Sequence, residues 1–231
     1  MKKKASILLL FCFFIAMQQS MAQDAKAIIR LAYKNFAPIS DYSCKTFINF
    51  DIPGLNIEHI DGMIFYKKPS KFRVRCNGIV FLPKQNPNQI LSIISDTLSF
   101  MPVFMGKETV NAISCDIVQL IPLKDQDIVA AKIYIDSKGL VQKAQITSKE
   151  NGTANVINTF DASSKYGMPE KTMISFDMKK FKVPKMVSVD INSKSPTKTA
   201  GPLKTTGSVT LTFSAYKFNQ KLSDTVFTEK D

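Results

Sequence analysis

The feature that most constrains this chain is a side-chain pattern with a period of two residues. In residues 44–52, for example, Thr46, Ile48 and Phe50 fall on the same face of an extended segment. Successive side chains of a β-strand point to opposite sides, so this period predicts strands with one buried face. Similar patterns, separated by turns rich in Pro, Gly and Asn, predict further strands around residues 64–66, 72–76, 107–123, 129–136, 172–179, 184–191 and 208–218.

Two segments have helical spacing instead. In residues 24–36, apolar side chains recur every three or four positions, and Pro38 ends the run. In residues 87–99, Pro87 suits a first helical turn and an apolar stripe follows, whose apolar character continues through residues 100–105. About ten antiparallel strands interrupted by two helices predict an α+β fold with a strongly curved sheet or incomplete antiparallel β-barrel.

The N-terminus has the composition of an export signal. Lysines at positions 2–4 precede an apolar run from 7 to 17, which is shorter than the roughly 20 residues of a membrane-spanning helix. Small residues three and one positions before Gln23 suit signal peptidase, so we expect residues 1–22 to be removed. Residues 23–231 are long enough for one buried core, and we expect a single monomeric domain in the periplasm.

The net charge limits the kinds of binding partner that are expected, and the number of cysteines limits the disulfides that can form. The formal net charge of +12 falls to +9 once the three leader lysines are removed. A basic surface suits an anionic membrane or an acidic protein, and export argues against nucleic acid, although solubility alone also explains the charge. The mature chain keeps Cys44, Cys76 and Cys115, an odd number, so no complete disulfide framework holds the fold and at most one bridge can form.

No catalytic or metal site is expected. The one histidine, His59, lies in a polar turn without a motif around it, and catalysis by serine or cysteine needs a base. Asp125 and Asp127 belong to a segment with turn composition. The three cysteines lack the close spacing that zinc sites favour. We therefore expect a protein that is not an enzyme and holds no metal or cofactor.

Residues 61–74 resemble the signature hairpin of periplasmic outer-membrane lipoprotein carriers, the LolA/LolB-like superfamily. The shared features are Gly62, an alternating strand, the basic pair Lys67 and Lys68 before Pro69, and a second strand with aromatic and basic residues. A weaker resemblance to the central strands of the same superfamily covers residues 106–110, 115–122 and 131–140.

This resemblance implies an incomplete β-barrel whose open mouth is covered by a helical lid, around an apolar cavity that takes up acyl chains. It also implies an acylated lipoprotein or lipid as cargo, an inner-membrane donor, an outer-membrane acceptor and transient proximity to membranes. The carriers typically have an arginine before the hairpin proline that hydrogen-bonds to the lid, and Lys68 stands there in this chain. Since lysine is a point charge and arginine a planar fork, that latch does not carry over intact.

Two candidate sites follow. The first is an apolar lining contributed by strands and lid, which also suits an ordinary filled core: Phe50, Ile64, Tyr66, Phe72, Val74, Ile90, Leu91, Ile94, Leu98 and Met101. The second is a set of basic residues for lid latching and for docking acidic partners or anionic headgroups: Lys67, Lys68, Lys71, Arg73 and Arg75. Lys71, Arg73 and Arg75 share one strand face, and charges on an edge strand also serve simply to block aggregation.

Three functions are compatible with the sequence. The first is a periplasmic carrier that shields the acyl chains of lipoproteins or lipids and moves them toward the outer membrane. The second is a regulatory protein on the same scaffold that senses lipid or lipoprotein. The third is a structural envelope protein with a filled core.

Overall fold

The computed structural model describes residues 25–53, 59–76, 87–96, 98–162, 164–178 and 205–228. Its described strands form one sheet of ten in the order β3-β2-β1-β10-β9-β8-β7-β6-β5-β4, and every neighbouring pair is antiparallel. The strands are β1 (Asp41–Asp51), β2 (Ile60–Lys67), β3 (Lys71–Cys76), β4 (Phe100–Val110), β5 (Ile113–Pro122), β6 (Ile128–Asp136), β7 (Val141–Ser148), β8 (Gly152–Thr159), β9 (Lys171–Asp177) and β10 (Thr206–Phe218).

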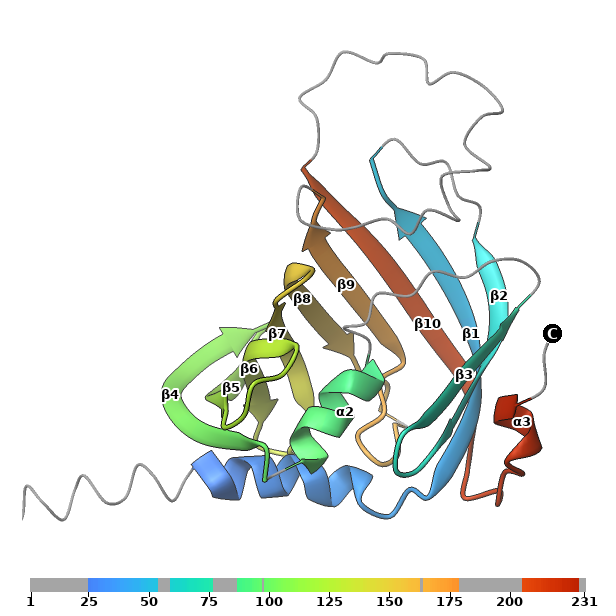
Figure 1. Ribbon diagram of the computed structural model, residues 1–231, viewed down its shortest axis with the longest axis horizontal. Coiled ribbons are helices and arrows are strands. Elements are labelled where there is room, and N and C mark those ends of the chain that lie inside the picture. The colour runs from blue at the N-terminus through green and yellow to red at the C-terminus, as the bar shows by residue number, and fades with distance from the viewer. Residues whose placement is uncertain are drawn as a thin grey trace, which may run out of the picture.

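The sheet is strongly curved but open (Figure 1). β3 and β4 follow one another in the described chain, yet they lie at opposite ends of the strand order. Helix α2 (Pro87–Ser95) belongs to the connection between them and lies in front of the sheet in Figure 1, whereas the helix of residues 25–36 runs along the lower end of the molecule. The predicted α+β fold, an incomplete antiparallel β-barrel with a helical lid, is confirmed.

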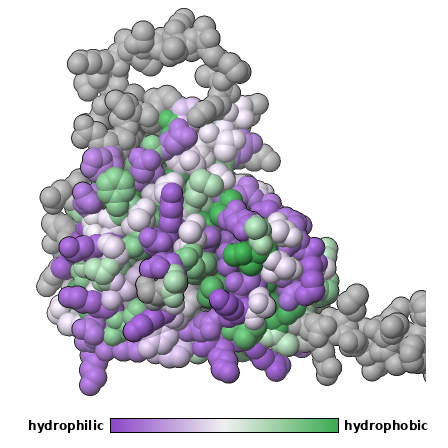
Figure 2. All heavy atoms as spheres, turned by 180° about the vertical axis from the view of Figure 1, so that it is seen from behind, coloured by the Kyte–Doolittle hydropathy of each residue, from purple (hydrophilic) through white to green (hydrophobic). Residues whose placement is uncertain are grey.

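The main core lies on the inner face of the sheet, because alternate residues of each strand turn inward. On β1, Ile48 is fully buried whereas its neighbour Phe47 is 41% exposed. Both helices add apolar side chains to this core: Ala25, Ile29, Ala32 and Phe36 from the first helix, and Ile90, Ile93 and Ile94 from α2. The face behind that of Figure 1 carries many hydrophilic side chains with smaller hydrophobic areas between them (Figure 2). No helix in the described part of the chain is long and apolar enough to cross a bilayer.

The second helix is shorter than its sequence pattern predicts. It ends at Ser95, not at residue 99. The Ser95 hydroxyl donates to the Leu91 carbonyl at 2.7 Å, and the Asp96 carboxylate accepts the backbone N–H of Ser99 at 3.1 Å, so a turn replaces the next helical turn. The apolar residues 100–105, which the sequence suggested as an extension of the lid surface, pair with β5 as part of β4 because they complete the sheet there.

A turn also divides the predicted β segment 107–123. Asn111 and Ala112 both have positive φ, 49° and 64°, and they reverse the chain between β4 and β5. A short helix that the sequence did not predict, α3 (Thr225–Thr228), follows the last strand. No disulfide joins Cys44, Cys76 and Cys115 in the described part of the chain. The predicted signal peptide of residues 1–22, the strand 184–191 and most of the loop 192–206 lie outside the described residues.

Two buried threonines differ in hydrogen bonding, and replacing each of them measures how much such bonds contribute to the stability of this core. The Thr46 hydroxyl is buried without a hydrogen-bond partner in the described structure, whereas the Thr172 hydroxyl donates to Asn158 Oδ1 at 2.8 Å. Valine keeps the shape of threonine and removes the hydroxyl. We therefore expect Thr46→Val to raise the free energy of unfolding by about 1 kcal/mol and Thr172→Val to lower it by about 1–3 kcal/mol. Urea denaturation measures both values, and a loss of stability in Thr46→Val would contradict the assignment.

Candidate ligand-binding site

The inner face beneath α2 brings most of the predicted apolar residues together. Four of them are buried members of the main core: Ile64, Tyr66, Ile90 and Ile94. Four more are half-buried and pack against it: Phe50, Phe72, Val74 and Leu91. These eight side chains come from β1, β2, β3 and α2, and all of them belong to or pack against the main core on the inner face.

Burial decreases toward the β3 edge of this surface. Ile64 and Tyr66 on β2 are buried, whereas their cross-strand partners Val74 and Phe72 on β3 are half-buried. β3 ends the strand order, so these two side chains have a neighbouring strand of the sheet on one side only. An apolar ligand that covers them would gain roughly 25 cal/mol for each Å² removed from water.

An aromatic cluster fills the inner face next to the N-terminal helix. The Tyr42 and Tyr66 rings stack with centroids 5.3 Å apart, and the Tyr66 ring lies 5.9 Å from that of Phe36. Tyr216 lies 6.0 Å from Tyr42 and stacks on Phe218 at 5.4 Å. Protein side chains therefore occupy this end of the inner face.

Buried groups on the inner face also have surroundings of low polarity. Burial raises the pKa of the Cys44 thiol to about 12, and burial is the main reason why the pKa of Tyr216 lies far above its usual range. Burial, followed by the nearby Tyr33, raises the pKa of Tyr66. Such shifts mean that the surroundings stabilise charged groups poorly. A hydrocarbon chain therefore suits this face better than a charged group does.

Lys68 ties the β2–β3 hairpin to the N-terminal helix. Its Nζ donates to the Ala37 carbonyl at 2.7 Å and lies 5.0 Å from the centroid of the Phe36 ring. Partial burial lowers the pKa of its ammonium group. A cation is favourable here because carbonyl groups point outward at the C-terminal end of a helix. The family resemblance implies a contact to the lid from this position, but the contacts described for Lys68 go to the end of the helix 25–36.

Two predicted lining residues lie apart from the other eight. Leu98 follows the end of α2 and is 86% exposed. Met101 belongs to β4 and not to the lid; it pairs with Ile121, and both side chains are largely exposed. Since the neighbouring Phe100 is buried in the core, the alternation of a strand turns Met101 away from it.

The predicted basic residues Lys71, Arg73 and Arg75 lie on the opposite side of β3 from Phe72 and Val74. They pair with Lys67, Phe65 and Met63 on β2, respectively. The Arg75 guanidinium lies 5.5 Å from the centroid of the Phe65 ring. The two candidate sites are therefore on opposite faces of the same hairpin.

Sequence reasoning missed two cavities of mixed polarity that are lined by other residues than the predicted apolar site. One, of about 720 Å³, lies where Asn35 of the N-terminal helix meets the β6–β7 turn and the segment after β8. The other, of about 690 Å³, is lined by residues of β1, β2, β3 and β10, including Lys45, Phe47 and Arg75. Side chains from distant segments line each cavity, so no local motif could have revealed them. Exposed His59 stacks on Phe47, with ring centroids 4.8 Å apart.

Three solved structures share this fold. A DUF1329 family protein from Desulfovibrio piger matches with a TM-score of 0.56 at 13% identity, over 88% of this chain and 96% of that chain. A LolA superfamily protein from Nitrosomonas europaea matches with a TM-score of 0.56 at 14% identity, over 89% of this chain and 97% of that chain. A domain described as an outer membrane lipoprotein-sorting protein from Vibrio parahaemolyticus matches with a TM-score of 0.53 at 11% identity, over 89% and 97% of the two chains.

These matches concern the fold. No protein-family model and no curated protein matches the sequence. At identities of 11% to 14%, the likeness shows a common architecture and leaves ligands and partners open. The resemblance to LolA-like proteins inferred from the hairpin is thereby confirmed at the level of the fold.

The Lys68 contact yields a test of the hairpin–helix connection. Lys68→Ala removes both the hydrogen bond to Ala37 and the contact with Phe36, so we expect the end of the N-terminal helix to open more often. Hydrogen–deuterium exchange should be about tenfold faster in residues 33–39, in line with the roughly 1.5–3 kcal/mol of a hydrogen bond to a charged group, reduced by solvent.

The control for this experiment is Lys45→Ala, which removes an exposed cation from the outer face of β1 and should leave exchange in residues 33–39 unchanged. Equal exchange in Lys68→Ala and the unaltered protein would rule out a role of Lys68 in holding the helix.

Proposed function

We propose that this protein is a periplasmic carrier that binds the acyl chains of lipoproteins or other lipids beneath α2 and moves them toward the outer membrane. In this proposal residues 1–22 direct export, and residues 23–231 act as one domain. An inner-membrane donor would load the chain and an outer-membrane acceptor would receive its cargo. The protein performs no chemical reaction on the ligand.

The observation that carries the proposal is the half-buried apolar surface between α2 and the β3 edge. Phe72, Val74 and Leu91 pack on the core but are only partly covered by it. Burying one methylene group contributes about 0.8 kcal/mol, so an acyl chain in water favours such a surface strongly. The outer-face cavity near Phe47 is less suitable, because Lys45, Asp61 and Arg75 line it as well.

Helix α2 suits the role of a removable cover. It has nine residues, and isolated helices shorter than about 12–15 residues are marginal in water. Its stability therefore depends on packing against the sheet through Ile90, Ile93 and Ile94. A ligand that enters beneath α2 competes with part of this packing and replaces it with contacts to hydrocarbon, so loading and release can both proceed without a large change in free energy.

The first test places a charge on the ligand-facing side of α2. Leu91→Glu puts a carboxylate beside the apolar surface, whereas Ser92→Glu adds the same group at the exposed neighbouring position. We expect Leu91→Glu to weaken binding of a fluorescent fatty acid at least tenfold, because a charge beside hydrocarbon is poorly solvated, and Ser92→Glu to bind normally. Equal affinity in both variants, or no uptake by the unaltered protein, would remove the proposed site.

The second test varies the ligand. For saturated fatty acids of 10 to 14 carbons, the dissociation constant should fall by up to about fourfold per added methylene, which corresponds to about 0.8 kcal/mol. Isothermal titration calorimetry below the critical micelle concentration measures this series. A flat series would show that the hydrocarbon chain remains in water and that binding depends on the carboxylate alone.

A further inference from the structure

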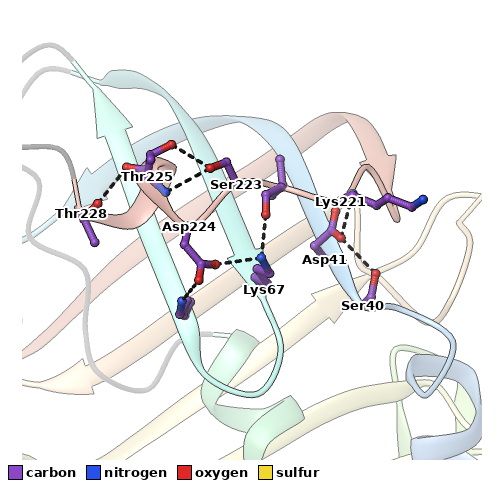
Figure 3. A network of polar contacts seen from close by, with 10 residues as sticks. Ser40, Asp41, Lys67, Lys221, Ser223, Asp224, Thr225 and Thr228 are labelled. Atoms are coloured by element: carbon purple, nitrogen blue, oxygen red, sulfur yellow. Dashed lines mark hydrogen bonds and ion pairs between the residues drawn. The ribbon is translucent and has the colours of Figure 1, made fainter.

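The C-terminal segment of the chain lies against the basic outer face of the β2–β3 hairpin (Figure 3). We call residues 222–228 the strap; they include the short helix α3, which contacts β3. Lys67 Nζ donates both to the Leu222 carbonyl at 2.7 Å and to the Asp224 carboxylate at 2.8 Å. The other carboxylate oxygen of Asp224 lies 2.7 Å from Lys71 Nζ.

A third contact extends the pattern along the hairpin. Arg73 Nη1 donates to the Val226 carbonyl at 3.2 Å. The side chains of the basic face therefore donate hydrogen bonds to a backbone carbonyl, a carboxylate and a second backbone carbonyl, at residues 222, 224 and 226. This every-second-residue spacing is a property of a peptide chain, and a single lipid headgroup does not reproduce it.

The strap has a fixed root and an exposed tip. At the root, the buried Asp41 carboxylate accepts the backbone N–H groups of Gln220 at 2.7 Å and Lys221 at 3.1 Å. At the tip, the Asp224 side chain is 61% exposed and α3 contains no buried residue. The tip is held mainly by surface charges and hydrogen bonds, and the root does not depend on these contacts.

Such a tip is easily displaced. Exposed ion pairs stabilise proteins weakly, and salt screens them. Hydrogen bonds from Lys67 and Lys71 lower the pKa of Asp224 to about 2, so its carboxylate stays ionised, and the attraction persists, also in mildly acidic solution. The strap thus occupies the basic face without being packed into the core.

We propose that the outer face of the β2–β3 hairpin is a docking surface for an acidic segment of a partner protein, and that the strap occupies it as an internal competitor. Charge complementarity supports this partner, because Lys67, Lys71, Arg73 and Arg75 share the face. The contacts to two backbone carbonyls favour a peptide over a membrane surface. The proposal is independent of lipid binding, which concerns the opposite face of the hairpin.

Competition within one chain is effective even when each contact is weak. A segment attached by a short linker acts at an effective concentration of about millimolar. An external segment with similar contacts therefore binds poorly until the strap is released. Reversing the charge of Asp224 should release the tip and leave the Asp41 contacts of the root in place.

The test uses full-length protein and a fluorescein-labelled peptide with the sequence of residues 219–231. We expect Asp224→Lys to bind this peptide at least tenfold more tightly than the unaltered protein in fluorescence anisotropy, with affinity falling as salt rises. Adding Lys67→Glu and Lys71→Glu to Asp224→Lys should abolish binding, whereas adding Lys45→Glu, an exposed cation on β1, should preserve it. Thermal melts of all variants establish that they are folded.

Three outcomes would overturn the proposal. The first is equal peptide affinity in Asp224→Lys and the unaltered protein. The second is peptide binding that survives the two lysine reversals in a folded variant. The third is binding of Asp224→Lys to vesicles containing phosphatidylglycerol without binding to the peptide, which would assign the face to anionic headgroups. None of these results bears on fatty-acid binding, so the two proposals fail separately.

Discussion

The whole structure depends on covering the inner face of a curved sheet that does not close. Ten antiparallel strands place their apolar side chains on that face, and the described strands leave β3 and β4 as free edges. Apolar surface in water is unfavourable in proportion to its area. Two helices add apolar side chains to it, and two of the residues that stay only half-buried, Phe72 and Val74, lie on an edge strand. The proposed ligand site thus includes a part of the inner face that the described protein covers incompletely.

The two helices differ in how firmly they are held. The N-terminal helix packs four apolar side chains into the core, and Lys68 fixes its end to the β2–β3 hairpin through Ala37. Helix α2 has nine residues and is placed by packing of Ile90, Ile93 and Ile94 on the same face. A ligand would therefore displace α2 more readily than the N-terminal helix. In the proposed carrier, α2 is therefore the element expected to move.

The sequence predicted the elements whose signal is local. The period of two located β6 and β10 to within two residues, because hydrophobic alternation marks strands directly. The turn at Asn111 and Ala112 was missed, since alanine rarely adopts the left-handed conformation that it has there. The predicted lining residues of β1, β2 and β3 lie on the inner face, whereas Met101 lies on β4 and turns away from the core, because helical and strand surfaces cannot be distinguished in a continuous apolar run. The strap was unpredictable: its contact between Lys67 and Asp224 spans 157 positions and leaves no periodic pattern.

The β2–β3 hairpin links both proposals because alternation gives it two chemically different faces. Tyr66 and Phe72 pair across the strands on the inner side, and Lys67 and Lys71 pair one residue further along on the outer side. A partner segment that replaces the strap would act on the same backbone that supports the apolar surface. Any shift of β3 at this edge, which has a neighbouring strand on one side only, moves Phe72 together with Lys71.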